Sequence, residues 1–441
     1  LIFKFANQNF GLKESNMKSP KASPTLVMNE KVNAMWADGK DVLHLGFGES
    51  RFPVHPALSQ MFQENASQRS YLSSLGVPEL RDTIAKYYSE KLGINFIDKQ
   101  IIVGVGSKSL LYAMIQSIEG DLLLPKPSWV SYSSIAHLTG KTIHRFLLDD
   151  KNDYSLNIQA LDKAYQDFIS DGGNPTMLVL NTPSNPVGNV SSDDEMKSVA
   201  NWAQDKNIFI LSDEIYSLVT HEGFSHKTIA KYYPEKTIIF GGLSKHLSLG
   251  GWRFGMAILP NNEHGNYLSK SFQSIAGSIW SCVPGPIQYT AILAYSGNQD
   301  IDAYIKMCTH IHELRTNYVH RKLKEIGLDS PSPSGAFYLY PSFKKWKDKL
   351  EKMNIFSCQN LSEYLLDDFG IATLPGSAFG SDLNNFCLRL STSFLDMETD
   401  EQAKNIIDAY SDDFDNFIEN HHPRTALFLE KMSQFMALLN E

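Results

Sequence analysis

Seven short apolar runs between residues 101 and 259 alternate with longer segments of helical periodicity, and this rhythm restricts the fold more than any other feature. The runs are IIVGV (101–105), DLLLP (121–125), TIHRFLL (142–148), TMLVLN (176–181), NIFILS (207–212), TIIFGG (237–242) and GMAIL (255–259). Several are apolar throughout, as in strands covered on both faces. The intervening segments predict helices over 109–119, 129–139, 158–169 and 193–205. We therefore expect an α/β fold whose large domain has a mostly parallel sheet sandwiched by helices.

The two ends of the chain have a different sequence pattern. They combine long amphipathic segments with a few short strand patterns, such as GAFYLYP (335–341) and FCLRLSTS (386–393). We predict a smaller α+β domain built from both chain ends. Residues 1–50 would join this small domain, 51–290 would form the large domain, and 291–441 would form the small domain with a helical C-terminal extension. After Pro423 the extension has apolar residues at helical spacing, which favours a packing or dimer helix over a regulatory one.

Composition excludes several classes of protein. The net charge of −9 argues against a general nucleic-acid binder. No apolar run approaches the roughly 20 residues of a membrane span, and the polar N-terminal segment does not resemble a secretory signal. Four dispersed cysteines form no CxxC pair, which favours free thiols in a reducing compartment over disulfides or a zinc site. We expect a cytoplasmic protein that holds no metal and binds neither nucleic acid nor membrane.

Polar or glycine-rich segments follow five of the apolar runs directly. They are GVGSKS (104–109), PKPSW (125–129), NTPSNPVG (181–188), DEIY (213–216) and LSKH (243–246). In open parallel sheets, ligands bind at the carboxyl ends of the strands. The five segments therefore predict one shared site at that edge of the sheet.

Three of these segments indicate a cationic ring as the ligand. Asp213 follows an apolar strand, where a carboxylate is costly unless it is paired. A helix N-cap would explain it alone; the functional alternative is an anion facing a heterocycle, with Tyr216 donating to a phenolate-like oxygen. The stiff turn of NTPSNPVG would fix the Asn185 amide against a ring substituent, although a rigid loop needs no ligand. Trp129 could stack on a flat ring, although such a tryptophan is more often core.

The other segments indicate a phosphate and an aldehyde. GVGSKS ends a strand and begins a helix, so free N–H groups and the Ser107 hydroxyl would cradle a phosphate. Lys245 lies in the apolar, glycine-rich stretch GGLSKHLSLGGWRFG, where burial beside other cations lowers a lysine pKa and yields a nucleophilic amine. Arg253 offers a guanidinium to the phosphate. Together these groups describe a site for pyridoxal 5′-phosphate.

The sequence resembles the class I/II aminotransferases of the aspartate aminotransferase superfamily (fold type I) over roughly residues 20–410. The matching motifs are YLSSLGVPELR (71–81), NTPSNPVG, SDEIY, the SK pair with GWRFG (251–255), LPGSAFG (374–380) and RLSTSF (389–394). The resemblance implies a pyridoxal-phosphate aminotransferase that moves an amino group between an L-amino acid and a 2-oxo acid. It also implies a homodimer, in which Tyr71 reaches the phosphate of the neighbouring subunit.

The resemblance assigns roles to individual residues. It implies that Lys245 forms the Schiff base and shuttles the proton, that Asp213 pairs with the pyridine nitrogen, and that Arg389 clamps the substrate α-carboxylate. Implied cofactor contacts are Gly106, Ser107, Lys108, Trp129, Asn185, Asp213, Tyr216, Ser244, Lys245, Arg253 and Tyr71; implied substrate contacts are Gly48, Asn185 and Arg389.

The sequence also departs from the family pattern. Gly242 stands where the family often has serine, and Ser244 is the candidate replacement. No arginine lies in FQSIAGSIWSCVPG (272–285), where the best-known aspartate enzymes have one. Lys108 matches the position at which another branch reads acidic side chains; a phosphate-supporting lysine is the equal alternative. Acidic or aromatic substrates both stay open. So do a lyase, decarboxylase or oxidase reaction and, remotely, a regulator domain, which the short N-terminal segment and acidic charge disfavour.

Overall fold

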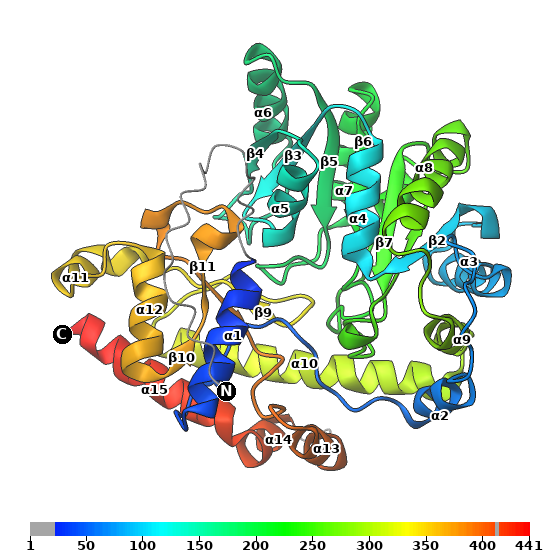
Figure 1. Ribbon diagram of the computed structural model, residues 1–441. Coiled ribbons are helices and arrows are strands. Elements are labelled where there is room, and N and C mark those ends of the chain that lie inside the picture. Colours follow the sequence, from blue (N-terminus) through cyan, green and yellow to red (C-terminus); the bar gives the residue numbers. More distant parts are fainter. Residues whose placement is uncertain (1–22, 411–413) are drawn as a thin grey trace, which may run out of the picture.

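A seven-stranded sheet flanked by helices organises the computed structural model, which describes residues 23–410 and 414–441 (Figure 1). Its strand order is β2-β8-β7-β6-β5-β3-β4. The strands are β2 (Ile101–Val105), β3 (Asp121–Lys126), β4 (Ile143–Leu147), β5 (Pro175–Asn181), β6 (Phe209–Asp213), β7 (Thr237–Gly242) and β8 (Phe254–Ile258). β8 runs antiparallel to both β2 and β7, and all other neighbours are parallel. All seven predicted runs therefore form strands of one mostly parallel sheet.

Both faces of this sheet are covered, which is why its strands lack polar alternation. Ile238 and Phe240 of β7 pack with α4 (Ser107–Ser117) and α8 (Glu263–Ile279). Ile239, between them in sequence, packs on the opposite face with α3 (Pro78–Leu92), α9 (Gly285–Ala294) and the start of α10 (Gln299–Glu325). Helices α6 (Ile158–Ser170) and α7 (Asp193–Asp205) bury their apolar faces against β5 and β6. The predicted fold class is confirmed.

The four predicted helices of this region are present, with small shifts at their ends. The predicted segment 109–119 corresponds to α4, which begins two residues earlier because Gly106, with φ 82°, turns the chain directly out of β2. The segment 129–139 corresponds to α5 (Val130–Leu138). Helix α7 begins where predicted, since Ser192 and Glu195 form a capping box at its first turn.

Two small sheets lie outside the large one, and the two-stranded one joins residues from both chain ends. β1 (Leu43–His44) pairs in parallel with β10 (Ile371–Ala372), and β12 (Leu388–Ser391) lies between β11 (Leu374–Pro375) and β9 (Tyr338–Leu339). The other helices are α1 (Pro24–Ala37), α2 (Pro56–Glu64), α11 (Lys347–Lys352), α12 (Cys358–Phe369), α13 (Asp400–Asp408), α14 (Phe414–His421) and α15 (Pro423–Asn440). Helix α10 reaches from the large sheet to these small sheets (Figure 1). The predicted boundaries at residues 50 and 290 stay predictions.

Helix α15 packs as its apolar spacing predicts. Its buried side chains join a cluster with β1 and β12; they are Phe428, Met432, Phe435, Met436 and Leu439. Within residues 23–410 and 414–441 no helix is long and apolar enough to cross a membrane. The same residues contain no His, Cys, Asp or Glu cluster suited to a metal, and all four cysteines are free. The prediction that the polar N-terminal segment is no secretory signal falls on residues 1–22, outside the described part.

Candidate active site

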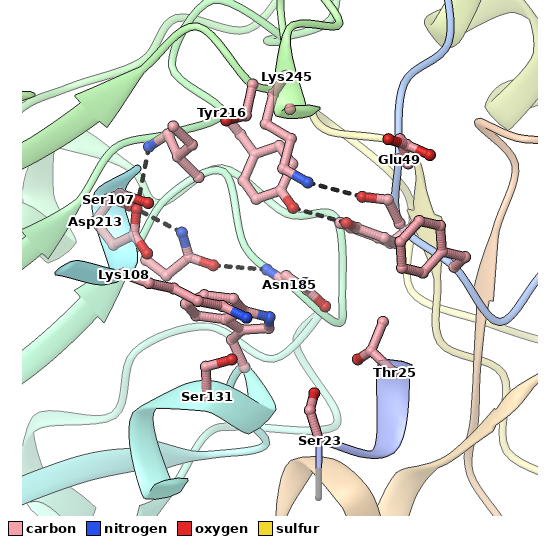
Figure 2. A pocket seen from close by; sticks show the side chains of 18 of the residues that line it. Ser23, Thr25, Glu49, Ser107, Lys108, Ser131, Asn185, Asp213, Tyr216 and Lys245 are labelled. Carbon is pink, nitrogen blue, oxygen red and sulfur yellow. Dashed lines mark hydrogen bonds between the residues drawn. The ribbon is translucent and has the colours of Figure 1, made fainter. Parts of the chain in front are cut away.

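A cavity of about 390 Å³ lies at the carboxyl edge of the large sheet and is closed by residues from the chain ends. Figure 2 shows side chains that follow β6 and β7 facing the same space as Ser23 and Thr25 at the start of α1. Of the predicted site residues, it is lined by Gly48, Ser107, Lys108, Trp129, Asn185, Asp213, Tyr216, Ser244, Lys245, Arg253 and Arg389. Gly106 lies behind Arg253, and Tyr71 is 88% exposed outside the cavity.

Lys245 lies in the connection between β7 and β8 and points into the cavity. Its Nζ donates to the Gly48 carbonyl oxygen at 2.7 Å and lies 5.4 Å from the centre of the Tyr216 ring. Burial lowers the pKa of Lys245 to about 8, and the charges of Arg389 and Lys108 act in the same direction. The carboxylates of Glu49 and Asp213 oppose the shift in pKa. Lys245 therefore has a larger free-amine fraction near neutral pH than an exposed lysine, as its sequence context predicts.

Asp213 ends β6 and is only 2% exposed. Its Oδ2 accepts from the Tyr132 hydroxyl at 2.7 Å, and its Oδ1 accepts from the Ile215 N–H at 3.3 Å. Burial raises the pKa of Asp213 to about 6, against the effect of these hydrogen bonds and of the Lys245 charge. No helix begins at Asp213, since the next helical turn after β6 spans Ile229–Lys231. The N-cap interpretation of this carboxylate is therefore wrong.

The turn NTPSNPVG is fixed to the Asp213 strand end. The Asn181 side chain donates from Nδ2 to the Asp213 carbonyl oxygen at 2.8 Å, and its Oδ1 accepts from the Asn185 N–H at 2.8 Å. One side chain thus fixes both the backbone of Asp213 and the start of the segment that carries the Asn185 amide. Asn185 itself is 5% exposed.

Arg253 packs against Gly106, directly before the start of α4, and Lys108 in the first turn of α4 is a second cation lining the cavity. A Cβ atom on Gly106 would lie 2.2 Å from Arg253 Nη2, so only glycine permits this approach. Arg253 has φ 58°, and its Nη1 donates to the Gly250 carbonyl oxygen at 2.7 Å. The first N–H groups of a helix have no intrahelical partner and favour an anion. Lys108 Nζ lies 5.2 Å from the Trp129 ring centre, and burial followed by the Arg253 charge lowers the pKa of Lys108.

Glycine at position 242 has a packing reason. A Cβ atom there would lie 2.7 Å from the carbonyl oxygen of Phe254, on the strand paired with β7. A serine side chain does not fit at this position without displacing backbone. Ser244 lines the cavity two residues further on.

Arg389 enters the cavity from β12 and is 1% exposed. Its Nη2 donates to the Gly46 carbonyl oxygen at 2.6 Å, and its Nη1 lies 3.5 Å from Asn185 Oδ1. Its guanidinium also lies 4.9 Å from the centre of the Tyr338 ring. Arg389 Nε is buried and has no hydrogen-bond partner within the described part of the chain. An unpaired guanidinium N–H in a cavity is suited to a carboxylate.

Sequence reasoning missed several cavity residues. Tyr132 contacts Asp213, and the Tyr338 hydroxyl hydrogen-bonds that of Tyr216 at 2.7 Å. The other missed lining residues are Ser23, Thr25, Leu26, Phe47, Glu49, Ser131, Asn181, Ile215 and Gly250. A signal existed for Tyr132, which is three residues after Trp129 and so on the same side of a helix. Tyr338 and the start of α1 reach the cavity only through tertiary folding.

The α/β sheet brings an amine, a carboxylate and an arginine to one edge, and comparisons with known proteins identify the class of this chain. The aminotransferase class I and II family model matches residues 40–407. An aspartate aminotransferase of Geobacillus stearothermophilus is 32% identical over 389 residues, covering 86% of this chain and 94% of that protein. An asparagine–oxo-acid transaminase of Streptococcus mutans is 30% identical over 398 residues, with coverages of 88% and 96%.

The fold comparison agrees. The structure of aspartate aminotransferase from Thermus thermophilus with maleate has a TM-score of 0.79 at 22% identity, covering 94% of this chain and 100% of that one. The chain belongs to the class I and II aminotransferases. It is a transaminase, and the predicted enzyme class is confirmed.

Proposed function

We propose that this transaminase holds pyridoxal 5′-phosphate in the cavity and transfers amino groups between an acidic L-amino acid and a 2-oxo acid. The observation that carries the proposal is the set of cations lining the cavity. Among the described residues they are Lys108, Lys245, Arg253 and Arg389. Arg253 suits the cofactor phosphate, Lys245 its aldehyde and Arg389 a substrate α-carboxylate. Lys108 is left for a second carboxylate.

The residues present fit the cofactor. The glycine-restricted contact between Gly106 and Arg253 at the start of α4 makes a cradle for a phosphate, with Ser107 beside it and Ser244 within reach of the same cavity. Asp213 would pair with the pyridine nitrogen, Tyr216 and Asn185 with the ring oxygen, and Trp129 with the ring face. When bound, the cofactor supplies an electron sink for the charge left by proton removal.

Lys245 is suited to moving the proton. A pKa of about 8 leaves part of its amine free near neutral pH, so Nζ could take the proton from the substrate α-carbon and deliver it at the aldehyde carbon of the cofactor. The bond from Nζ to Gly48 holds the amine beside the strand segment that Arg389 also contacts through Gly46. The substrate carboxylate on Arg389 and the proton acceptor are therefore positioned by one backbone segment.

A donor screen tests this function. The purified full-length protein, loaded with pyridoxal phosphate, is incubated with each common amino acid and 2-oxoglutarate, and both products are measured. Aspartate or glutamate should be the fastest donor. Faster transfer from aromatic donors would overturn the acidic assignment, and no transfer from any donor would overturn the function. A Lys86→Ala protein, altered on the exposed face of α3, is the matched control for the lysine variants below.

We also infer a homodimer. Tyr71 is 88% exposed and outside the cavity of its own chain, so a contact with a phosphate requires a second subunit. Native mass measurement should give twice the chain mass of 49.6 kDa. Tyr71→Phe should weaken cofactor retention without changing that mass. A monomeric active enzyme would disprove the inference. A cytoplasmic location stays a prediction.

A further inference from the structure

Residues 408–441 lie beyond the segment matched by the aminotransferase family, yet Arg424 contacts Val42, five residues before Phe47, which lines the cavity. We propose that this C-terminal extension positions the substrate side of the active site through Arg424. The proposal deepens the proposed function and rests on it. Arg424 does not line the cavity and acts through the backbone of residues 41–49; it is a positioning residue.

The start of α15 is fixed to the loop that follows β12, the strand of Arg389. Asp396 in that loop is 4% exposed, and its Oδ1 accepts from the Arg424 N–H at 2.6 Å. Its Oδ2 accepts from the Thr425 N–H at 3.1 Å and from the Thr425 hydroxyl at 2.6 Å. One carboxylate thus satisfies two free N–H groups in the first turn of the helix. The apolar side of α15 is buried against β1 and β12, so Arg424 projects from an anchored element.

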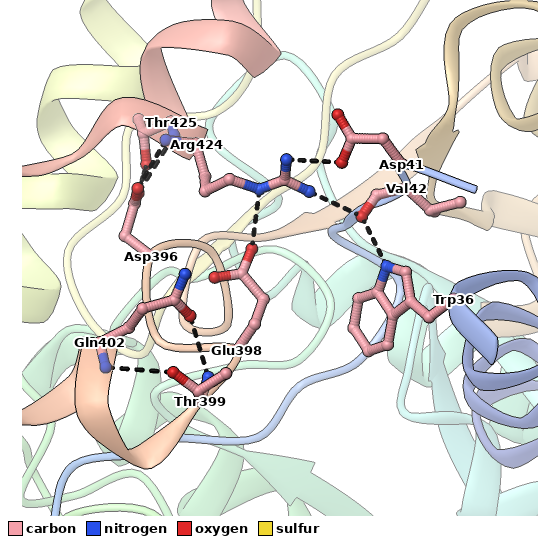
Figure 3. A network of polar contacts seen from close by, with 9 residues as sticks. All are labelled: Trp36, Asp41, Val42, Asp396, Glu398, Thr399, Gln402, Arg424 and Thr425. Atoms are coloured by element: carbon pink, nitrogen blue, oxygen red, sulfur yellow. Dashed lines mark hydrogen bonds and ion pairs between the residues drawn. The ribbon is translucent and has the colours of Figure 1, made fainter. Parts of the chain in front are cut away.

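The Arg424 side chain reaches the turn between α1 and β1 (Figure 3). Nη1 donates to Asp41 Oδ1 at 2.6 Å, Nη2 donates to the Val42 carbonyl oxygen at 3.0 Å, and Nε donates to Glu398 Oε1 at 3.3 Å. The Val42 oxygen also accepts from Trp36 Nε1 at 3.0 Å. The Arg424 guanidinium therefore joins three segments that are far apart in the sequence.

The same strand segment leads directly into the cavity. Leu43 donates to the Gly370 carbonyl oxygen at 2.8 Å as β1 begins. Three and five residues further on, Gly46 and Gly48 accept from Arg389 and Lys245. Glu49, which lines the cavity, accepts through its carbonyl oxygen from Ser393 Oγ at 2.8 Å. Gly46 and Gly48 follow Val42 by only four and six residues, so we expect a shift at Val42 to move the acceptors on which Arg389 and Lys245 depend.

Helix α1 makes this anchoring more important. Its first turn contributes Thr25 and Leu26 to the cavity wall, yet Val32 is its one buried residue, and Leu26 and Val27 are about half exposed. Partly buried Met28, Met35 and Trp36 pack with Val32, and Asn29 Oδ1 is hydrogen-bonded to His44 Nε2. At the C-terminal end of the helix, Trp36 and Arg424 share the Val42 oxygen, so this end adds a polar anchor to those contacts.

The test compares full-length Arg424→Gln and Asp41→Asn with Arg321→Gln, which alters an exposed arginine paired with Glu325 on α10. Arg424→Gln should raise KM for the fastest amino donor about tenfold, the size expected when a charged hydrogen-bond donor is removed, and leave kcat within about twofold. Asp41→Asn should raise KM less, because the Asp41 side chain is 61% exposed. A lower melting temperature with unchanged KM, or equal effects in Arg321→Gln, would overturn the proposal.

A second readout does not depend on catalysis. In the cofactor-free proteins, hydrogen–deuterium exchange of peptides covering residues 41–49 should be faster in Arg424→Gln than in wild type and Arg321→Gln. Unchanged exchange there would count against the proposal whether or not the donor screen succeeds. A failed donor screen with accelerated exchange would overturn the proposed function alone. If Arg424→Gln does not fold, Arg424→Lys, which keeps the charge, should show smaller changes of the same sign, and their absence would overturn the proposal.

Discussion

The sheet side and the chain-end side of the cavity are built in different ways. On the sheet side, Asp213 is the last residue of β6 and Lys245 follows β7 by three residues, and the backbone of both strands is hydrogen-bonded to neighbours on both sides. On the chain-end side, Arg389 lies on a short strand, and residues 46–49 are held by side chains that approach from other elements. The side chains on the two sides are suited to different parts of the reaction. Groups suited to proton transfer occupy the sheet side, and Arg389, which is suited to a substrate carboxylate, occupies the chain-end side.

Removal of Lys245 should have the largest effect and tests the sheet side. Lys245→Ala should lower kcat by about a thousandfold, because the variant lacks the amine that is proposed to accept the proton from the substrate α-carbon. Steady-state kinetics of Lys245→Ala, wild type and Lys86→Ala would measure this loss of kcat. Turnover close to that of Lys86→Ala would place the chemistry elsewhere.

Removal of the Arg389 charge tests the other side. Arg389→Gln should lower kcat/KM by about a hundredfold, since a buried charge that recognises a carboxylate would be lost. The loss should appear mainly in KM, in contrast to Lys245→Ala. Arg321→Gln is the control for the change of arginine to glutamine. A loss confined to kcat would end the proposed division between the two sides.

Lys108 lies in the first turn of α4 on the sheet side, although the proposed function gives it a role in substrate recognition, so its replacement sharpens the comparison. Lys108→Ala should lower kcat/KM about tenfold for aspartate and glutamate and much less for neutral donors, if it pairs with a side-chain carboxylate. Parallel donor series for wild type and variant would measure the ratio. Equal losses for acidic and neutral donors would assign Lys108 to the cofactor phosphate instead.

The smallest expected effect is that of Glu49→Gln. Glu49 lies on the chain-end side, and its charge acts on Lys245 on the sheet side. The pKa of Lys245 is about 8, so in the cofactor-free protein its free amine should increase as the pH rises through that value. The negative charge of Glu49 raises this pKa. Glu49→Gln should therefore move the midpoint to lower pH, by less than about one unit for a partly exposed charge. The pH dependence of labelling of the Lys245 peptide by an amine reagent, followed by mass spectrometry, would show it; a shift to higher pH would contradict it.

The two sides also differ in how far sequence alone predicts them. Strand ends of a parallel sheet share one edge, so Asp213 and Lys245 could be placed together from the order of apolar runs. The family resemblance, and no local pattern, pointed to Gly48 and Arg389. Tyr338 and the start of α1 come from segments whose approach depends on packing of the whole molecule. The same holds for Arg424, whose importance lies in contacts with residues almost four hundred positions away.

The antiparallel direction of β8 restricts where this enzyme can accept insertions and deletions. A parallel neighbour of β7 would need a long crossover, whereas β8 returns at once through residues 243–253. That hairpin connection therefore carries Lys245 near one end and Arg253 at the other. Its length determines how the two side chains are placed relative to each other. An insertion or deletion within it would move the Lys245 amine and the Arg253 guanidinium relative to each other, so natural length variation should be rarer there than in the exposed loops elsewhere.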